Sequence, residues 1–132
     1  MKLIHVGAAV HDIEQARVTY EKVFGYVLLA GPVVDPIQNV AVCFVGTGSP
    51  GDLSFELVCP LAGESPVSSM LRKNLGAYHV CYQVEDIERT LREVRSKGCI
   101  VWGEPVPAVA FDGRRIAWFY TPAHLLVEVA ER

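Results

Sequence analysis

The chain contains one pattern of residues twice, and this internal repeat limits its possible folds more than any other feature. Residues 4–14 (IHVGAAVHDIE) align without a gap with residues 78–88 (YHVCYQVEDIE), at an offset of 74 residues. The identical pairs are His5/His79, Val6/Val80, Val10/Val84, Asp12/Asp86, Ile13/Ile87 and Glu14/Glu88. Such a repeat predicts two copies of one supersecondary unit that pack against each other.

Later parts of the two copies match in the same order. Gly25 falls over Gly98, and residues 39–45 (NVAVCFV) fall over 114–120 (RRIAWFY), which places Phe44 over Phe119. Residues 53–57 (LSFEL) then fall over 125–129 (LLVEV), at an offset of 72. Loops tolerate such small changes of length. We therefore expect a single domain, 1–132, with one module at about 1–59, a linker at 60–75 and a second module at about 76–132, because a chain of this length is the size of one domain.

Each copy has the pattern of a strand, a helix and three further strands. Asp12 with Gln15 three residues later predicts a helix start, and Gly25 predicts its end; Asp86 and Gly98 do the same in the second copy. The predicted fold class is therefore α+β, with two tandem βαβββ modules. The expected strands are 2–10, 26–30, 39–46 and 52–59 in the first copy, and 100–102, 114–120 and 124–130 after the helix of the second; a short helix from Ser65 to Lys73 is expected in the linker.

A histidine and a glutamate recur in apolar strands of both copies. Residues two apart share one face of a strand, so His5 points away from Ile4 and Val6. Glu56 and Glu128 each lie between apolar residues, where an unpaired carboxylate costs free energy. Taken alone, each glutamate fits an arginine partner or an exposed face, and each histidine fits a core position. The repeat instead favours one divalent metal, with the ligands His5, Glu56, His79 and Glu128.

Two imidazoles and two carboxylates leave two of six coordination positions open for substrate or water. Nitrogen and oxygen ligands suit a first-row transition metal (cobalt, nickel, manganese or zinc), and the sequence does not distinguish these.

Paired βαβββ modules with this His…Glu…His…Glu set resemble the vicinal oxygen chelate superfamily. That superfamily includes glyoxalase I, methylmalonyl-CoA epimerase, extradiol dioxygenases, and bleomycin and fosfomycin resistance proteins. The resemblance covers essentially the whole chain, and its motifs are IHVGAAVHDIEQARVTYEKVFGY, LSFELVCPLAGESPV, GAYHVCYQVEDIERT and HLLVEVAE. It implies a glyoxalase-like fold with a concave metal-binding cleft, and it carries the family's metal ligands over to His5, Glu56, His79 and Glu128.

The motifs resemble two subfamilies. FELVCPLAGESPV and GAYHVCYQVEDIERTLREVRSKG look most like methylmalonyl-CoA epimerases, whereas the ligand set and VCFVGTG resemble bacterial-type glyoxalase I. The epimerases usually have glutamine at the position of Glu56 and a further acidic base where our alignment places Val42. An aliphatic side chain cannot move a proton, so Val42 departs from the epimerase pattern.

Both subfamilies imply a metal-dependent isomerase or lyase that transfers a proton α to a carbonyl of a small acyl thioester or 2-oxo compound. The expected catalytic residues are Glu128 and Glu56, and Glu128 is favoured as the base because it matches an acidic residue in both subfamilies. One alternative is a non-catalytic drug-binding resistance protein, although such binders commonly lack the four ligands. Another is an extradiol-type dioxygenase, which uses two histidines and one carboxylate on Fe(II); Glu56 speaks against it.

Other polar residues are candidates for binding substrate. Arg115 is aligned opposite Val40 and is predicted to face the cleft, where it would suit an anionic group; the alternative is a solvated arginine at a strand start. Gln38 and Gln83 are weaker candidates for the same lining. His11 and His124 are expected at the surface. The four cysteines have no CxxC spacing and are expected to be thiols in apolar surroundings.

Composition and charge restrict the partners. The net charge is −3 and no basic block occurs, which argues against nucleic acid, and no apolar run is long enough to cross a membrane. The first residues lack the features of a signal peptide, so we expect a cytoplasmic protein. The strands 40–44 and 116–119 are apolar on both faces, which favours a homodimer. Within it, we expect all four ligands to come from one chain.

Overall fold

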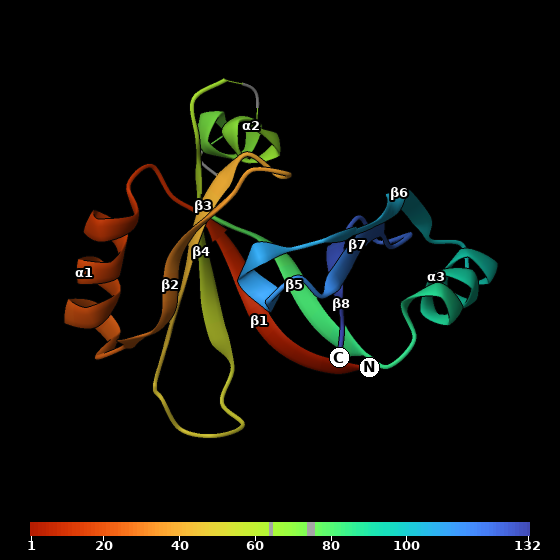
Figure 1. Cartoon of the computed structure of the whole chain (residues 1–132), viewed down its shortest axis with the longest axis horizontal. Helices are drawn as coiled ribbons and strands as arrows, with labels where there is room; N and C mark the ends of the chain where they lie inside the picture. Colours follow the sequence, from red (N-terminus) through yellow and green to blue (C-terminus); the bar gives the residue numbers. More distant parts are fainter. Residues whose placement is uncertain (64, 74–75) are drawn as a thin grey trace. The chain divides into compact units, whose positions relative to one another are not determined.

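The computed structural model describes residues 1–63, 65–73 and 76–132, and the chain divides into two compact units (Figure 1). One unit comprises His5–Tyr78; the other comprises Met1–Ile4 and His79–Arg132. The predicted boundaries of the domain, its modules and its linker stay a prediction. Residues 64, 74 and 75 of that linker lie outside the described residues.

The first copy forms a four-stranded sheet with the strand order β2-β3-β4-β1. Strand β1 pairs in parallel with β4, whereas the β2–β3 and β3–β4 pairs are antiparallel. A short helix, α2, follows this sheet and is capped by the Ser65 side chain, as the sequence predicts. The elements are β1 (Lys2–Ala9), α1 (Ile13–Phe24), β2 (Val27–Asp35), β3 (Val40–Gly46), β4 (Ser54–Pro60) and α2 (Pro66–Arg72).

The second copy has the same topology. Its strand order is β5-β8-β7-β6, with β5 parallel to β8 and the other two pairs antiparallel. The repeat therefore predicts the βαβββ order of both copies correctly. The elements are β5 (Ala77–Val84), α3 (Ile87–Ser96), β6 (Ile100–Pro107), the 3-10 helix η1 (Val109–Phe111), β7 (Arg115–Tyr120) and β8 (Leu126–Glu131).

Each sheet buries one face under its own helix. The carboxylates of Asp12 and Asp86 accept the backbone N–H of Gln15 and Arg89 at 2.9 Å, which starts α1 and α3 where the sequence predicts. Under α1 the core contains Ala8, Ile13, Cys43, Val45 and Leu57. Under α3 it contains Val84, Ile87, Leu91, Val94, Ala117, Phe119, Val127 and Val129. The alternation of side chains along a strand then leaves His5, Glu56, His79 and Glu128 on the opposite faces.

The strands β2 and β6 are longer than predicted. The sequence suggests strands at 26–30 and 100–102, whereas the observed strands continue through Gly31-Pro32 and Pro105. Both strands lie at the edge of their sheet, where a missing N–H is tolerated, and both contain register shifts at these residues.

The four cysteines are free thiols, as expected from their apolar surroundings. Cys43 and Cys81 are buried, whereas Cys59 and Cys99 are partly exposed. Burial raises the pKa of Cys43 to about 11, so this side chain stays a thiol at neutral pH. In the part of the chain that the structure describes, none of the helices combines the length and the apolar character needed to cross a membrane.

Candidate metal centre

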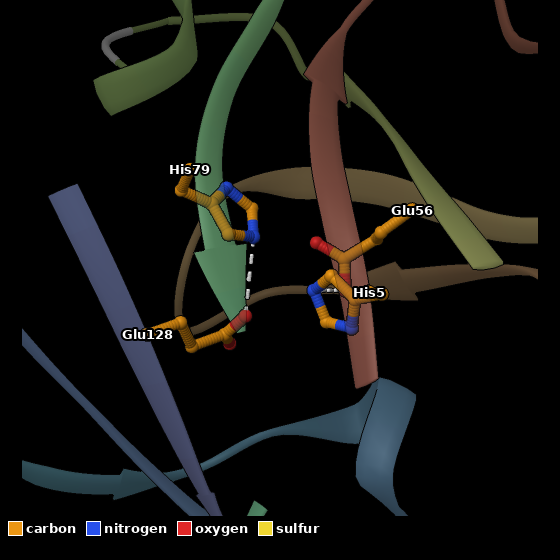
Figure 2. A group of neighbouring side chains, drawn as sticks. All are labelled: His5, Glu56, His79 and Glu128. Carbon is orange, nitrogen blue, oxygen red and sulfur yellow. Dashed lines mark ion pairs between the residues drawn. The ribbon is translucent and has the colours of Figure 1, made fainter. Parts of the chain in front are cut away.

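The first sheet holds a buried His–Glu pair (Figure 2). His5 on β1 and Glu56 on the neighbouring strand β4 are 1% and 6% exposed, and Nε2 of the histidine lies 3.8 Å from Oε2 of the glutamate. In the β1–β4 register the residue opposite Glu56 is Gly7, two residues after the histidine and therefore on its face. The parallel pairing thus brings together two side chains that lie far apart in the sequence.

The second sheet holds an equivalent pair. His79 on β5 and Glu128 on β8 are each 2% exposed, and Nε2 of the histidine lies 3.2 Å from Oε2 of the glutamate (Figure 2). Cys81 stands opposite Glu128, just as Gly7 stands opposite Glu56. In both sheets the glutamate therefore stands opposite the residue two positions after the histidine, and this equivalence is what the repeat predicts.

An aromatic ring accompanies each pair. Phe44 on β3 stands opposite Glu56, and its ring meets the His5 ring edge-on at a centroid distance of 5.4 Å. Trp118 on β7 stands opposite Glu128, and its ring meets His79 edge-on at 4.9 Å. Aromatic rings favour such edge-to-face contacts.

This geometry corrects one part of the sequence alignment. We aligned Phe44 with Phe119, but the structural equivalent of Phe44 is Trp118, and Phe119 packs in the core under α3. The alignment paired two phenylalanines because they are the same residue type, and this placed the second copy one residue out of register. A shift of one residue along a strand moves each side chain to the other face of the sheet. Val42 does share the face of Phe44, as expected, and it is buried.

Arg115 lies on the helix-covered face of its sheet rather than on the face of His79 and Glu128, where we expected it. Its Nε and Nη2 donate to the two carboxylate oxygens of Glu131 at 3.0 Å, and its Nη1 donates to Glu88 on α3 at 2.9 Å. The misplacement follows from the alignment error, since Arg115 shares its face with Phe119. These bonds raise the pKa of Arg115 and lower the pKa of Glu131.

We expect Arg115→Met to lower stability and to leave substrate binding unchanged. The two-pronged ion pair is partly exposed and screened by solvent, so its loss should lower the free energy of unfolding only slightly. Because the folded-state pKa of Glu131 is lowered, the contribution is complete above its unfolded value of 4.5 and is lost as the pH falls through the folded-state value. Urea unfolding at pH 7 and pH 3 measures both effects. A raised KM for anionic substrates with unchanged stability would contradict this assignment.

The weaker candidates lie away from the His–Glu pairs or at their margin. Gln38 follows β2, and its side-chain amide donates to buried Asp35 at 2.9 Å. Gln83 on β5 lines a hollow of about 500 Å³ together with Lys2, Arg89 and Arg132. His11 and His124 are exposed, as expected. A role of Gln38 or Gln83 in binding substrate stays a prediction.

The donor chemistry of the pairs fits a transition metal. Each pair offers one imidazole nitrogen and one carboxylate oxygen, and all four residues are buried. Buried charged groups require a charged partner, and a divalent cation would neutralise the carboxylates while the neutral imidazoles donate their lone pairs. Phe44 and Trp118 pack edge-on against the two histidine rings.

Comparisons with known proteins agree with this fold. Residues 4–118 match the family model described as "Glyoxalase/Bleomycin resistance protein/Dioxygenase superfamily". The chain is 37% identical over 98 residues to the mitochondrial methylmalonyl-CoA epimerase of Bos taurus, which covers 73% of the chain and 54% of the relative, so it spans about half that protein's length. It is 31% identical to the ethylmalonyl-CoA/methylmalonyl-CoA epimerase of Cereibacter sphaeroides over 121 residues, 90% of the chain and 87% of the relative.

A solved structure shows the same architecture. The methylmalonyl-CoA epimerase of Mycobacterium tuberculosis superposes with a TM-score of 0.84 at 25% identity, and the match covers 98% of this chain and 87% of that one. The predicted α+β fold of two βαβββ modules is therefore confirmed. By its family match, its repeat and its paired histidines and glutamates, the chain belongs to the glyoxalase/bleomycin resistance protein/dioxygenase superfamily.

Proposed function

We propose that the chain is a metal-dependent isomerase or lyase that transfers a proton on the carbon next to a carbonyl group. The observation that carries this proposal is the buried His–Glu pair at the same register of both sheets. A core without a function has no need of two such pairs, because apolar side chains would fill it at lower cost. The named epimerase relatives support the same reaction class.

In this proposal His5, Glu56, His79 and Glu128 hold one divalent metal, which is cobalt, nickel, manganese or zinc. When bound, the metal supplies a Lewis acid that polarises a carbonyl oxygen and stabilises the enolate. The two sheets each supply one imidazole and one carboxylate. The concave metal-binding cleft expected from the family is part of this proposal.

Glu128 is the proposed base. A carboxylate near a polarised carbonyl can take the α-proton and return it to either face or to a neighbouring carbon. Glu56 is the second candidate, because Val42 supplies no acid on the adjacent strand and Glu56 is the carboxylate that the first sheet brings to its histidine. Glu56 is itself buried, and aromatic Phe44 stands opposite it on β3.

The proposed substrate is a small acyl thioester or 2-oxo compound. The printed names of the relatives favour a malonyl-CoA-type thioester, as in an epimerase. Glu56 favours the alternative, a lactoylglutathione lyase-like reaction, because it completes a ligand set of two histidines and two glutamates. A drug-binding protein or an extradiol-type dioxygenase stays a less favoured alternative.

Exchange of the α-proton with deuterium tests the reaction class before the product is known. NMR spectra in D₂O should show loss of the α-proton signal for a member of a panel of acyl-CoA thioesters and hemithioacetals. EDTA should stop the exchange, and one added divalent metal should restore it. If EDTA does not change the rate of exchange and elemental analysis finds no bound metal, the proposal that the reaction depends on a metal is wrong. Oxygen uptake with catechols would favour the dioxygenase.

We also propose a cytoplasmic homodimer that binds no nucleic acid and no membrane. The apolar strands β3 and β7 are themselves largely buried, so they do not require a second chain. Exposed apolar side chains instead gather at the end of α1 and along edge strand β2, and such patches often mark interfaces. They are Val23, Phe24, Val27, Leu28, Leu29 and Val34. A monomeric mass by light scattering would contradict the dimer.

Mixing two inactive variants tests whether one chain supplies all four ligands. We expect that a mixture of His5→Ala and Glu128→Ala proteins stays inactive after subunits have exchanged. If the ligands came from two chains, the mixed dimer would have one intact site, and roughly a quarter of the wild-type activity would return. A tag on one variant confirms by pull-down that subunits exchange. Recovered activity would contradict the single-chain site.

A further inference from the structure

Three aromatic side chains lie on one face of the second sheet, and we call them the aromatic shelf. They are Trp118 and Tyr120 on β7 and Trp102 on β6. Trp102 stands opposite Trp118, and Tyr120 follows two residues after Trp118, so all three share a face. The rings of Trp102 and Tyr120 lie 6.5 Å apart with an interplanar angle of 32°.

The shelf begins at the second His–Glu pair. Trp118 stands opposite Glu128 and meets the ring of His79 edge-on. From there the shelf runs outward to edge strand β6, where Trp102 is 59% exposed. A tryptophan ring has a large apolar surface that is usually buried, so an indole this exposed at the margin of a polar pair suggests a binding surface.

The fold does not require these rings. The core of this unit lies on the opposite face, where Ala117 and Phe119 pack against α3. In the first copy the equivalent of Tyr120 is Gly46, which follows Phe44 by two residues. A Cβ at Gly46 would lie 3.0 Å from Cδ1 of Leu29, so that copy is built without an aromatic ring there.

We propose that the aromatic shelf binds an aromatic ring carried by the substrate, next to the carbonyl group that reacts at Glu128. The proposal rests on the proposed function and narrows its substrate class to carbonyl compounds with a planar apolar substituent. In this proposal Trp118 lies nearest to the reacting carbonyl group of the substrate. Trp102 and Tyr120 contact the aromatic ring of the substrate farther from Glu128. Stacking on such rings rewards planar groups over bulky aliphatic ones of similar size.

The test compares two 2-oxo acids that have no α-hydrogen and so cannot react by proton transfer. Benzoylformate carries a phenyl ring, and trimethylpyruvate carries a tert-butyl group in its place. Binding is followed through the indole N–H signals of Trp102 and Trp118 in ¹⁵N NMR spectra, which are assigned with Trp→Phe variants. We expect benzoylformate to bind about 3- to 10-fold more tightly and to shift both indole signals.

Trp102→Ala should remove most of this preference by weakening benzoylformate about 3- to 10-fold while trimethylpyruvate changes little. Ile37→Ala is the matched control, because Ile37 is also 59% exposed, lies in the turn between β2 and β3 in the other unit, and is not part of the patch proposed for the dimer. Equal affinity for the two acids, or a preference that survives in Trp102→Ala, would overturn the shelf as a substrate site. If Trp102→Ala turns a dimer into a monomer and leaves the preference for benzoylformate unchanged, the shelf is instead a contact surface for a second copy of the chain.

These outcomes are separate from the proposed function. The proposed function is judged by α-proton exchange and its response to EDTA, whereas the shelf is judged by binding of acids that cannot exchange. If α-proton exchange depends on a metal but benzoylformate binds no more tightly than trimethylpyruvate, only the proposal for the aromatic shelf is wrong.

Discussion

Replacing Glu128 with glutamine is expected to slow α-proton exchange by about 10²- to 10⁴-fold, the usual contribution of a positioned acid or base. The amide keeps the size of the side chain and an oxygen that can still bind metal, but it cannot take a proton. Metal content should therefore stay close to that of the wild-type protein. Initial rates of deuterium incorporation and elemental analysis of the same samples measure the two properties separately.

Glu56→Gln is the matched control for this prediction. Glu56 is buried beside His5 as Glu128 is buried beside His79, so the same substitution is made in equivalent surroundings. We expect a loss of about tenfold or less, because the glutamine retains the ligand oxygen and leaves the base in place. A larger loss in Glu56→Gln than in Glu128→Gln would transfer the role of base to Glu56.

Replacing His79 with alanine is expected to weaken metal binding at least about 100-fold, since changes in the groups around metal ligands alone cost 10- to 100-fold. The substitution removes one of the two imidazole donors and leaves buried Glu128 without its 3.2 Å partner. The thermal midpoint of the metal-loaded protein should fall, because the stabilisation by a bound metal decreases with its affinity. Titration with one metal and a thermal scan measure both effects.

His124→Ala is the control for the histidine substitution. His124 lies in the same unit as His79 but is exposed in the turn before β8. Its removal should change neither metal affinity nor the thermal midpoint by a comparable amount. Metal affinity that is the same in His79→Ala and in the wild-type protein would contradict the role of His79 as a ligand.

The repeat is the reason that much of the fold could be predicted from the sequence. Matching His5 with His79 and Asp12 with Asp86 predicts two copies of one topology, and the caps of α1 and α3 follow from those same aspartates. The faces of the ligand residues follow as well, because the side chains of a strand alternate and both histidines precede a helix start by a fixed spacing.

Register across loops could not be predicted in the same way. The alignment of Phe44 with Phe119 rests on one shared residue type after a loop of different length, and an error of one residue moves Arg115 to the wrong face. The full lengths of β2 and β6 could not be predicted either, because prolines are tolerated in edge strands and the sequence does not show which strands lie at an edge. Finally, the shelf was missed, since Trp102 and Trp118 become neighbours only through the β6–β7 pairing.

The parallel pairing of β1 with β4, and of β5 with β8, makes the first and last strands of each copy neighbours. A ribosome therefore makes His5 about fifty residues before Glu56, so this carboxylate cannot lie beside the histidine until the copy is nearly complete. Contacts of such long sequence separation form late and slowly in folding. The proposed metal site therefore predicts that a nascent or partly folded chain binds the cation weakly, and that full affinity is reached only after both copies have folded.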